Sequence, residues 1–256
     1  MDLGAGLNGK RVLVTGASSG LGRHFARLCA RNGARCAVAA RRTDRLEDLI
    51  AEIETDGKGP AAAFSLDVTD PVSIEACITG VTDRFGGIDI LVNNAGISGA
   101  GAVLDQPAEV FDQVIDTNLR GVWKVATAVA GVMRDGGAGG SIVNIASIIG
   151  FRPAAGLAAY GVSKAGVVYM TETLALEWAR YDIVVNALAP GYFETEINAG
   201  YFDTEAGQRT LKRVAMRRLG RLEDLNAPFM MLAGRGSAFM TGTTIPVDGG
   251  HLLSTL

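Results

Sequence analysis

The stretch Val12-Leu13-Val14-Thr15-Gly16-Ala17-Ser18-Ser19-Gly20-Leu21-Gly22 decides the fold. The apolar run Arg11–Thr15 predicts a buried strand, and the glycines after it predict a tight turn into a helix over 21–32. Glycines let the backbone approach a pyrophosphate closely, and the free amides and dipole of a helix N-terminus favour the anion. The spacing G-x-x-x-G-x-G differs from the general G-x-G-x-x-G fingerprint, so a turn without a ligand stays an alternative.

The same rhythm of strand, turn and helix continues along the chain. Further strands are predicted at 36–40, 61–66, 88–92, 142–146, 183–188 and 245–247, and further helices at 44–55, 71–85, 107–133 and 160–180. Most of the strands are unbroken apolar runs, which indicates a sheet covered on both faces. The sequence therefore predicts a doubly wound α/β fold, with a seven-stranded, mostly parallel sheet flanked by helices. One domain over 1–256 is expected, with a lid at about 191–220.

Composition excludes several classes of protein. The formal net charge of −3 gives no basic surface for nucleic acid, so no such partner is expected. No apolar run approaches the ~18 residues of a membrane span, and no secretory signal is visible, so we expect a cytoplasmic protein without membrane contact. No metal site is expected either, because the few cysteines and histidines show no ligand spacing: Cys29, Cys36, Cys77, His24 and His251.

Three side chains suggest acid–base chemistry. Tyr160 and Lys164 lie four residues apart, which puts both on one face of the predicted helix. A nearby ammonium stabilises a phenolate and lowers the pKa of a tyrosine from about 10, which suits proton transfer near neutral pH. Ser147 follows the predicted strand 142–146, where a hydroxyl faces the ligand crevice of an open α/β sheet. Each residue alone is also explained as an ordinary surface or capping residue.

Taken in order, the motifs resemble the compact form of the short-chain dehydrogenase/reductase family. The matching motifs are 15–22, Asp67-Val68, Asn93-Asn94-Ala95-Gly96, Asn118, Ser147, Tyr160, Lys164 and Pro190-Gly191. The resemblance covers about 7–250 and implies a Rossmann fold and an oxidoreductase that interconverts a ketone and a secondary alcohol by hydride transfer. It also implies a homo-oligomer, a tetramer or a dimer.

The resemblance implies a role for each motif residue. Tyr160 is the expected acid/base, and Ser147 is expected to hydrogen-bond the substrate oxygen. Lys164 is expected to bind the nicotinamide ribose and lower the pKa of Tyr160, and Asn118 to hold a relay water at a helix distortion. The expected cofactor-binding residues are Gly16, Ser18, Ser19, Gly20, Leu21, Gly22, Arg41, Arg42, Asp67, Val68, Asn94, Ala95, Gly96, Tyr160, Lys164, Pro190, Gly191, Phe193 and Thr195.

Cofactor preference depends on the end of the second predicted strand. Arg41 and Arg42 stand where an NAD-preferring enzyme usually has an acidic residue for the ribose hydroxyls. Guanidinium groups suit a 2′-phosphate, so NADP(H) is favoured. NAD(H) stays possible if both arginines face solvent, or if one stacks on adenine without selecting.

The predicted pocket walls are mostly apolar, which favours a neutral or partly apolar ketone or alcohol. Ser147, Ile149, Leu157, Tyr160 and Tyr192 are expected at the substrate, with Ile97 and Phe151 as further walls and Tyr201, Phe202 and Met216 in the lid. His251 is expected to be structural.

Two other functions remain open. One is a reductase of 3-oxoacyl thioesters of acyl carrier protein or coenzyme A, supported only by Arg217, Arg218 and Arg221. The other is a non-catalytic, cofactor-binding regulatory protein, against which the complete set Asn118, Ser147, Tyr160 and Lys164 argues.

Overall fold

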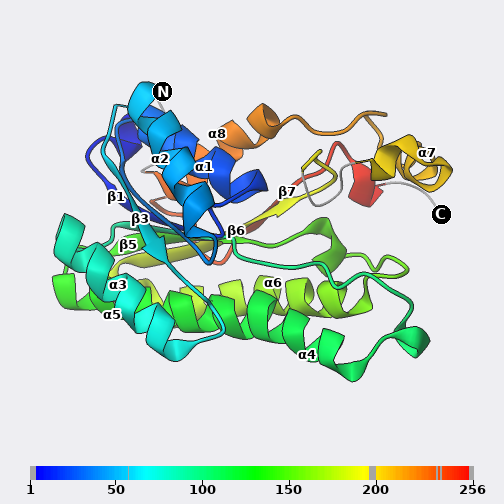
Figure 1. Cartoon of the computed structure of the whole chain (residues 1–256), viewed down its shortest axis with the longest axis horizontal. Coiled ribbons are helices and arrows are strands. Elements are labelled where there is room, and N and C mark those ends of the chain that lie inside the picture. The colour runs from blue at the N-terminus through cyan, green and yellow to red at the C-terminus, as the bar shows by residue number, and fades with distance from the viewer. Residues whose placement is uncertain (1–3, 57, 196–199, 235, 237, 254–256) are drawn as a thin grey trace.

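The computed structural model describes residues 4–56, 58–195, 200–234, 236 and 238–253. All seven predicted strands form, and they pair in parallel in one sheet of order β3-β2-β1-β4-β5-β6-β7 (Figure 1). The strands are β1 Arg11–Thr15, β2 Arg35–Ala40, β3 Ala61–Ser65, β4 Ile90–Asn93, β5 Gly140–Ile145, β6 Ile183–Pro190 and β7 Thr244–Val247. The order runs outward in both directions from the β1–β4 pair, which confirms a doubly wound Rossmann-like fold.

Helices cover both faces of the sheet (Figure 1). One face carries α1 Gly20–Arg31, α2 Thr43–Asp56 and α8 Asn226–Ala233, and the other carries α3 Pro71–Phe85, α4 Ala108–Ile115, α5 Val122–Gly136 and α6 Ala158–Trp178. The short α7, Glu205–Leu211, lies at one end of the molecule in Figure 1. A 3-10 turn, His251–Leu253, follows β7. Other 3-10 turns are Gly4–Leu7, Val103–Asp105, Ile148–Gly150, Ala179–Tyr181, Tyr201–Asp203 and Leu222–Leu225.

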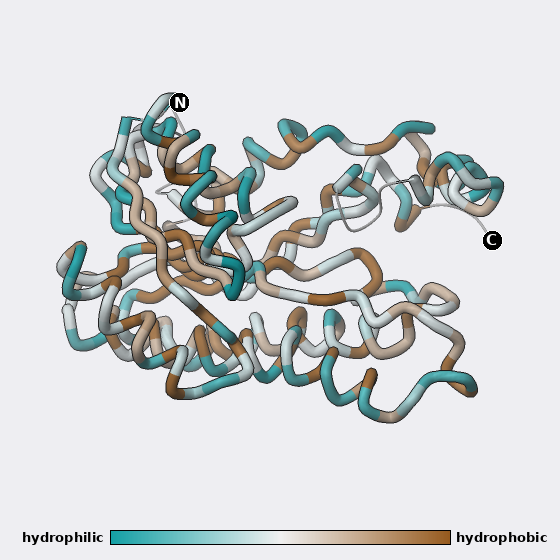
Figure 2. Tube along the Cα trace, in the orientation of Figure 1, coloured by the Kyte–Doolittle hydropathy of each residue, from teal (hydrophilic) through white to brown (hydrophobic). Residues whose placement is uncertain are grey.

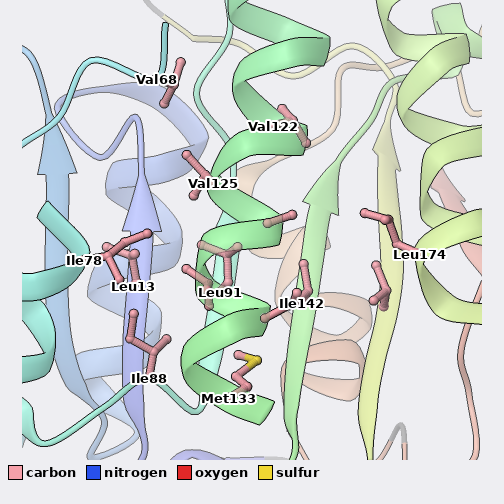
Figure 3. Close-up of a cluster of buried hydrophobic side chains, with 14 of the residues drawn as sticks. Leu13, Val68, Ile78, Ile88, Leu91, Val122, Val125, Met133, Ile142 and Leu174 are labelled. Atoms are coloured by element: carbon pink, nitrogen blue, oxygen red, sulfur yellow. The ribbon is translucent and has the colours of Figure 1, made fainter. Parts of the chain in front are cut away.

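Successive strand residues point into two different cores, which explains the unbroken apolar runs. Leu13 of β1 packs in the core that α3, α5 and α6 cover, whereas its neighbours Val12 and Val14 pack in the core under α1, α2 and α8. Figure 3 shows Leu13 in the first core with side chains of α5, among them Val125. Hydrophobic residues concentrate between the layers, and hydrophilic ones on the outer helix faces (Figure 2).

The helix expected over 107–133 is interrupted. A π-helical turn, Asp116–Gly121, separates α4 from α5. Asn118 lies in this turn with its side chain buried. Its Oδ1 accepts from the Ile97 amide at 2.8 Å, and its Nδ2 donates to the Ile97 carbonyl at 2.8 Å. Such turns insert a residue into an α-helix and often occur at functional sites.

Sequence periodicity did not reveal α8. Its side chains are apolar on nearly all sides, and Phe229, Met230 and Leu232 are buried. A helix of this kind has no polar stripe, so it lacks the 3.6-residue pattern used for detection. Of the lid predicted at about 191–220, residues 196–199 lie outside the described part. Among the described helices, none combines the length and apolar character needed to cross a membrane.

Candidate active site

A cleft of about 1300 Å³ opens at the carboxyl ends of the strands. Six strands, β1 to β6, each contribute a residue from their carboxyl end to its walls. These residues, each the last of its strand or the first after it, are Gly16, Ala40, Leu66, Asn94, Ile145 and Pro190. This is where ligands bind in open α/β sheets, around the point at which strand order reverses. The volume exceeds the roughly 300–1,000 Å³ of a pocket for one small ligand, so two ligands fit side by side.

Nearly all predicted binding residues line this cleft. It brings together Gly16, Ser18, Ser19, Gly20, Leu21, Arg41, Arg42, Asp67, Val68, Asn94, Ala95, Gly96, Ile97, Ser147, Ile149, Leu157, Tyr160, Lys164, Pro190, Gly191, Tyr192, Phe193, Thr195, Tyr201 and Phe202. Gly22, Asn118 and Phe151 are not among the lining residues, and Met216 lines a separate pocket of about 240 Å³.

The glycine-rich loop has the close backbone packing that a phosphate cradle needs. Gly16 has φ +64°, and a Cβ there would lie 2.9 Å from the Cα of Ala95. A Cβ on Gly22 would lie 2.4 Å from the Gly16 carbonyl oxygen. Ser19 precedes α1 but its side chain does not cap the helix. The helix N-terminus therefore faces the cleft with its dipole available to an anion, which fits a dinucleotide pyrophosphate.

Thr15 and Asn94 hold this loop against the end of β4. The Thr15 Oγ1 accepts from the amides of Asn94 and Ala95 at 3.0 and 3.1 Å. The Asn94 Nδ2 donates to the carbonyls of Thr15 and Gly16 at 3.0 and 3.2 Å. Asn94 thus fixes the loop by hydrogen bonds to its backbone. Asn93 joins β4 to α5, because its side chain donates to the Val122 carbonyl at 2.8 Å.

Positive charge gathers beside the loop at the end of β2. The Arg42 Nη2 donates to the hydroxyls of Ser18 and Ser19 at 3.0 and 3.1 Å. Asp67 lies in the same wall; hydrogen bonds from the amide and hydroxyl of Thr69 lower its pKa, with a smaller contribution from the charge of Arg41. This end of the cleft therefore presents two guanidinium groups and one ionised carboxylate.

Ser147, Tyr160 and Lys164 meet at the middle of the cleft. Ser147 follows β5, and its Oγ accepts from the Ile149 amide at 3.2 Å and hydrogen-bonds Tyr160. The Lys164 Nζ donates to the Ile145 carbonyl at 2.7 Å and lies 5.6 Å from the centre of the Tyr160 ring. Tyr160 and Lys164 share one face of α6, as their spacing predicts.

Burial sets the proton affinities of both α6 side chains. It raises the pKa of Tyr160, against the hydrogen bond from Ser147, which lowers it. It also lowers the pKa of Lys164 to about 8. The predicted lowering of the pKa of Tyr160 by Lys164 is therefore not found in this structure. The free-energy cost of removing a phenolate from water exceeds the stabilisation that the surrounding groups give it.

Asn118 connects to this group from behind the cleft. Its Nδ2 donates to the Ser163 hydroxyl at 3.2 Å, and that hydroxyl donates to the Tyr160 carbonyl at 2.7 Å. The π-helical turn is thereby linked to the first turns of α6. In this arrangement Asn118 acts on Tyr160 through the backbone.

The sequence missed a basic group at the other end of the cleft. Arg152, Arg213 and His251 line it beside Tyr192, so the expectation of a lining with few charges is wrong there. The arginines are far apart in sequence and form no motif, so only folding brings them together. The basic run named from the sequence does not line the cleft. In that run, Arg218 pairs with Asp224 at 2.7 Å, and Arg217 donates to the Lys212 carbonyl.

Comparisons with known proteins show which family the chain resembles. A sequence model described as enoyl-(acyl carrier protein) reductase matches residues 16–251. The 3-oxoacyl-[acyl-carrier-protein] reductase FabG of Vibrio cholerae is 38% identical over 95% of this chain and 98% of its own length. Sorbitol dehydrogenase of Cereibacter sphaeroides is 38% identical over 97% and 99%. A structure from Agrobacterium tumefaciens with bound NADP is 36% identical, with a TM-score of 0.86 over 97% and 98% of the two chains.

The chain belongs to the short-chain dehydrogenase/reductase family. It is therefore an oxidoreductase, of a family that uses NAD(P) and acts on small-molecule substrates. The alternative of a non-catalytic regulatory protein is set aside.

Proposed function

We propose that this enzyme interconverts a ketone and a secondary alcohol, with NADP(H) preferred over NAD(H). One observation carries the proposal: Ser147, Tyr160 and Lys164 converge in the cleft whose far wall holds Arg42 against the glycine-rich loop. Acid–base groups and a dinucleotide cradle thus share one cavity.

The cofactor would lie along the strand ends. The loop 16–22 and the N-terminus of α1 would hold the pyrophosphate, Asp67 and Val68 the adenine, and Asn94 to Gly96 the adjoining ribose. Arg41 and Arg42 would take the 2′-phosphate. Tyr160 and Lys164 would bind the nicotinamide ribose, and Phe193 and Thr195, with Pro190 and Gly191, the carboxamide side. When bound, the nicotinamide supplies or accepts the hydride.

The protein's own part is to handle the proton and the charge on oxygen. In reduction, the carbonyl carbon gains a hydride and its oxygen gains negative charge. The Tyr160 hydroxyl gives that oxygen a proton, while the Ser147 hydroxyl donates a hydrogen bond to it. In oxidation the Tyr160 phenolate takes the proton of the alcohol. Lys164 would position the Tyr160 ring, which lies beside it on α6, and Asn118 would position the Tyr160 backbone through the Ser163 hydroxyl.

The experiment is a spectrophotometric assay of NADPH oxidation with a panel of ketones and of NADP reduction with the matching alcohols. Turnover with at least one pair, and loss of it in Tyr160→Phe, is the expected result. No turnover with any member of a broad panel, despite cofactor binding, contradicts the proposal.

The 3-oxoacyl thioester reductase remains a narrower form of the same reaction. Its support in the sequence was Arg217, Arg218 and Arg221, and none of these lines the cleft. Adding 3-oxoacyl thioesters to the panel tests it directly.

We also propose one domain with a lid at about 191–220, and self-association as a tetramer or dimer. Exposed apolar side chains recur every seven residues on α6, at Val162, Tyr169 and Leu176, and therefore form one stripe. Such a stripe on a surface favours contact between protein molecules. Light scattering coupled to size exclusion gives the mass in solution, and Tyr169→Glu is expected to reduce it.

A further inference from the structure

Tyr192 places a phenol hydroxyl at the substrate end of the cleft, near the proposed acid/base. The residue lies two positions beyond the carboxyl end of β6, and it lines the cleft together with Ser147 and Tyr160. The proposed proton transfer and the proposed cofactor contacts do not use its hydroxyl. Because a tyrosine combines an apolar ring with a polar tip, it can give a ligand both packing and one directed hydrogen bond.

The backbone of Tyr192 is held on both sides. The Gly191 amide donates to the Val247 carbonyl at 2.9 Å, and the Tyr192 carbonyl accepts from the Gly220 amide at 2.9 Å. Gly191 also packs closely against the chain after β7, since a Cβ there would lie 2.7 Å from the Cα of Asp248. The Cα of Tyr192 is therefore fixed relative to the end of the sheet.

Two neighbouring rings hold the side chain of Tyr192. The Phe202 ring lies 5.6 Å from the Tyr192 ring at an interplanar angle of 73°, and the His251 ring lies 5.3 Å away at 50°. Inclined rings at such separations attract each other beyond what their buried area contributes. A side chain that is held before a ligand arrives loses little conformational entropy on binding it, so this hydroxyl is suited to recognition.

The hydroxyl of Tyr192 is available to a ligand. Among the residues that the structure describes, none hydrogen-bonds it, and solvent still reaches its oxygen. The neighbouring Tyr201 differs, because its hydroxyl hydrogen-bonds the Thr210 Oγ1 at 3.2 Å. A ligand that displaces water from the Tyr192 hydroxyl must replace the lost hydrogen bond, or it leaves a polar group unpaired at a free-energy cost.

The electrostatic neighbours of Tyr192 indicate that its hydroxyl faces the cleft. Burial raises the pKa of Tyr160, and a smaller contribution from Tyr192 acts in the same direction. Burial also raises the pKa of Tyr192, Tyr201 adds to this rise and Arg213 opposes it. Tyr160, Tyr201 and Arg213 all line the cleft, and none of them lines the pocket of about 240 Å³ that Tyr192 also touches. The Tyr192 hydroxyl is therefore uncharged near neutral pH and shares one cavity with the Tyr160 hydroxyl.

We propose that the substrate carries a second neutral oxygen, a hydroxyl or an acceptor such as a carbonyl, which hydrogen-bonds the Tyr192 hydroxyl while the reacting oxygen lies at Ser147 and Tyr160. This rests on the proposed reductase function and names its substrate class: an oxygenated ketone and the matching diol or hydroxy ketone. Tyr192 is then a specificity-determining residue, because two hydrogen bonds at separate points fix the orientation of the reacting carbon.

The test uses sets of ketones that differ at one position. Each set contains a hydroxy ketone, its methyl ether and the analogue with a methyl group in place of the hydroxyl, and successive sets move this position outward from the carbonyl by one carbon. The readout is kcat/KM for the oxygenated member divided by kcat/KM for the methyl analogue, at saturating NADPH. A methyl ether accepts but cannot donate a hydrogen bond, so it shows which partner is the donor.

The wild-type ratio is expected to exceed one in at least one set. A nearby oxygen also changes the intrinsic reactivity of a carbonyl, so the ratio is compared between wild type and variants. Tyr192→Phe keeps the ring and is expected to lower the ratio by about 2- to 10-fold, the range for one uncharged hydrogen bond.

Two further tyrosines serve for comparison. Tyr201→Phe removes a hydroxyl of the same wall that already bonds Thr210, so the ratio is expected to stay near its wild-type value. Tyr181→Phe, in the 3-10 turn Ala179–Tyr181 and outside the cleft lining, is the matched control. A ratio that falls in Tyr201→Phe and not in Tyr192→Phe overturns the assignment to Tyr192.

The outcomes distinguish this proposal from the reductase function. Turnover of ketones with a ratio near one in every set, or with a ratio that Tyr192→Phe leaves unchanged, overturns the second hydrogen bond while the reductase function stands. If no ketone is turned over, the shift in thermal midpoint on adding each member of a set to the NADP-bound protein still measures selectivity. A larger shift for the oxygenated member that is lost in Tyr192→Phe supports the site, and equal or absent shifts overturn it.

Discussion

The Nη2 atom of Arg42 donates to the hydroxyl of Ser18 at 3.0 Å, which joins the end of β2 to the glycine-rich loop. The guanidinium is therefore held where the adenosine ribose of a dinucleotide on this loop would lie. An acidic residue at such a place would repel a 2′-phosphate, whereas an arginine can bind it through two parallel hydrogen bonds.

Arg42→Ala is accordingly expected to change cofactor selectivity. The ratio of kcat/KM with NADPH to kcat/KM with NADH should fall by about 10- to 100-fold, because a charged hydrogen bond to the phosphate is lost. Arg45→Ala, on α2 and outside the cleft lining, is the control. Equal loss with both cofactors would show that Arg42 supports the loop without selecting the cofactor.

Tyr160→Phe is expected to lower kcat by about 100- to 10,000-fold, since it removes the proton donor while the ring keeps its packing. NADPH affinity, followed by its fluorescence, should change much less, because the loop and the arginines remain. A variant that retains most of its kcat would mean that another group supplies the proton.

Lys164 is expected to make stability depend on pH. Its pKa is lowered by burial from 10.5 to about 8, so between these values the unfolded chain binds more protons than the folded one. Stability therefore rises with pH across that window, and the destabilisation is fully present below it. Lys164→Met removes this dependence, so the difference in free energy of unfolding between wild type and variant should shift by up to about 3 kcal/mol. Urea unfolding between these pH values measures it, and a difference independent of pH contradicts the burial of a charged Lys164.

Gly22→Ala tests the packing under the loop. The new Cβ would lie 2.4 Å from the Gly16 carbonyl, so the loop or α1 must move. We expect a loss of stability of about 1–3 kcal/mol, the range for overpacking, and weaker cofactor binding. Gly131→Ala in α5 is the matched control, because nothing lies within 4 Å of its Cβ position. That change should be neutral or stabilising by about 0.5–1 kcal/mol. Thermal midpoints of both variants with and without NADPH decide the matter.

Local patterns in the sequence were enough to predict the strands of the sheet and the residues at the centre of the site. The run Arg11–Thr15 and the glycines after it predict a strand and a loop because apolar burial and positive φ are properties of single residues and their neighbours. Tyr160 and Lys164 are placed on one face by helical geometry alone. The roles of Asn118 and Asp67 came instead from the family resemblance, since neither has a local pattern of its own.

Features that depend on residues far apart in the sequence were decided by the tertiary structure alone. Only the fold brings Arg213 to the same wall as Arg152 and His251: the chain after α7 meets the end of the chain, where the Met216 amide donates to the Gly249 carbonyl at 3.0 Å. No spacing in the sequence encodes that meeting. The raised pKa of Tyr160 and the lowered pKa of Lys164 likewise depend on how much water the surrounding elements exclude. The sequence by itself determined the strands and the reactive groups, because these follow from short-range geometry. The charge of the site and its proton affinities required the fold, because burial and long-range contacts exist only after the chain has closed around them.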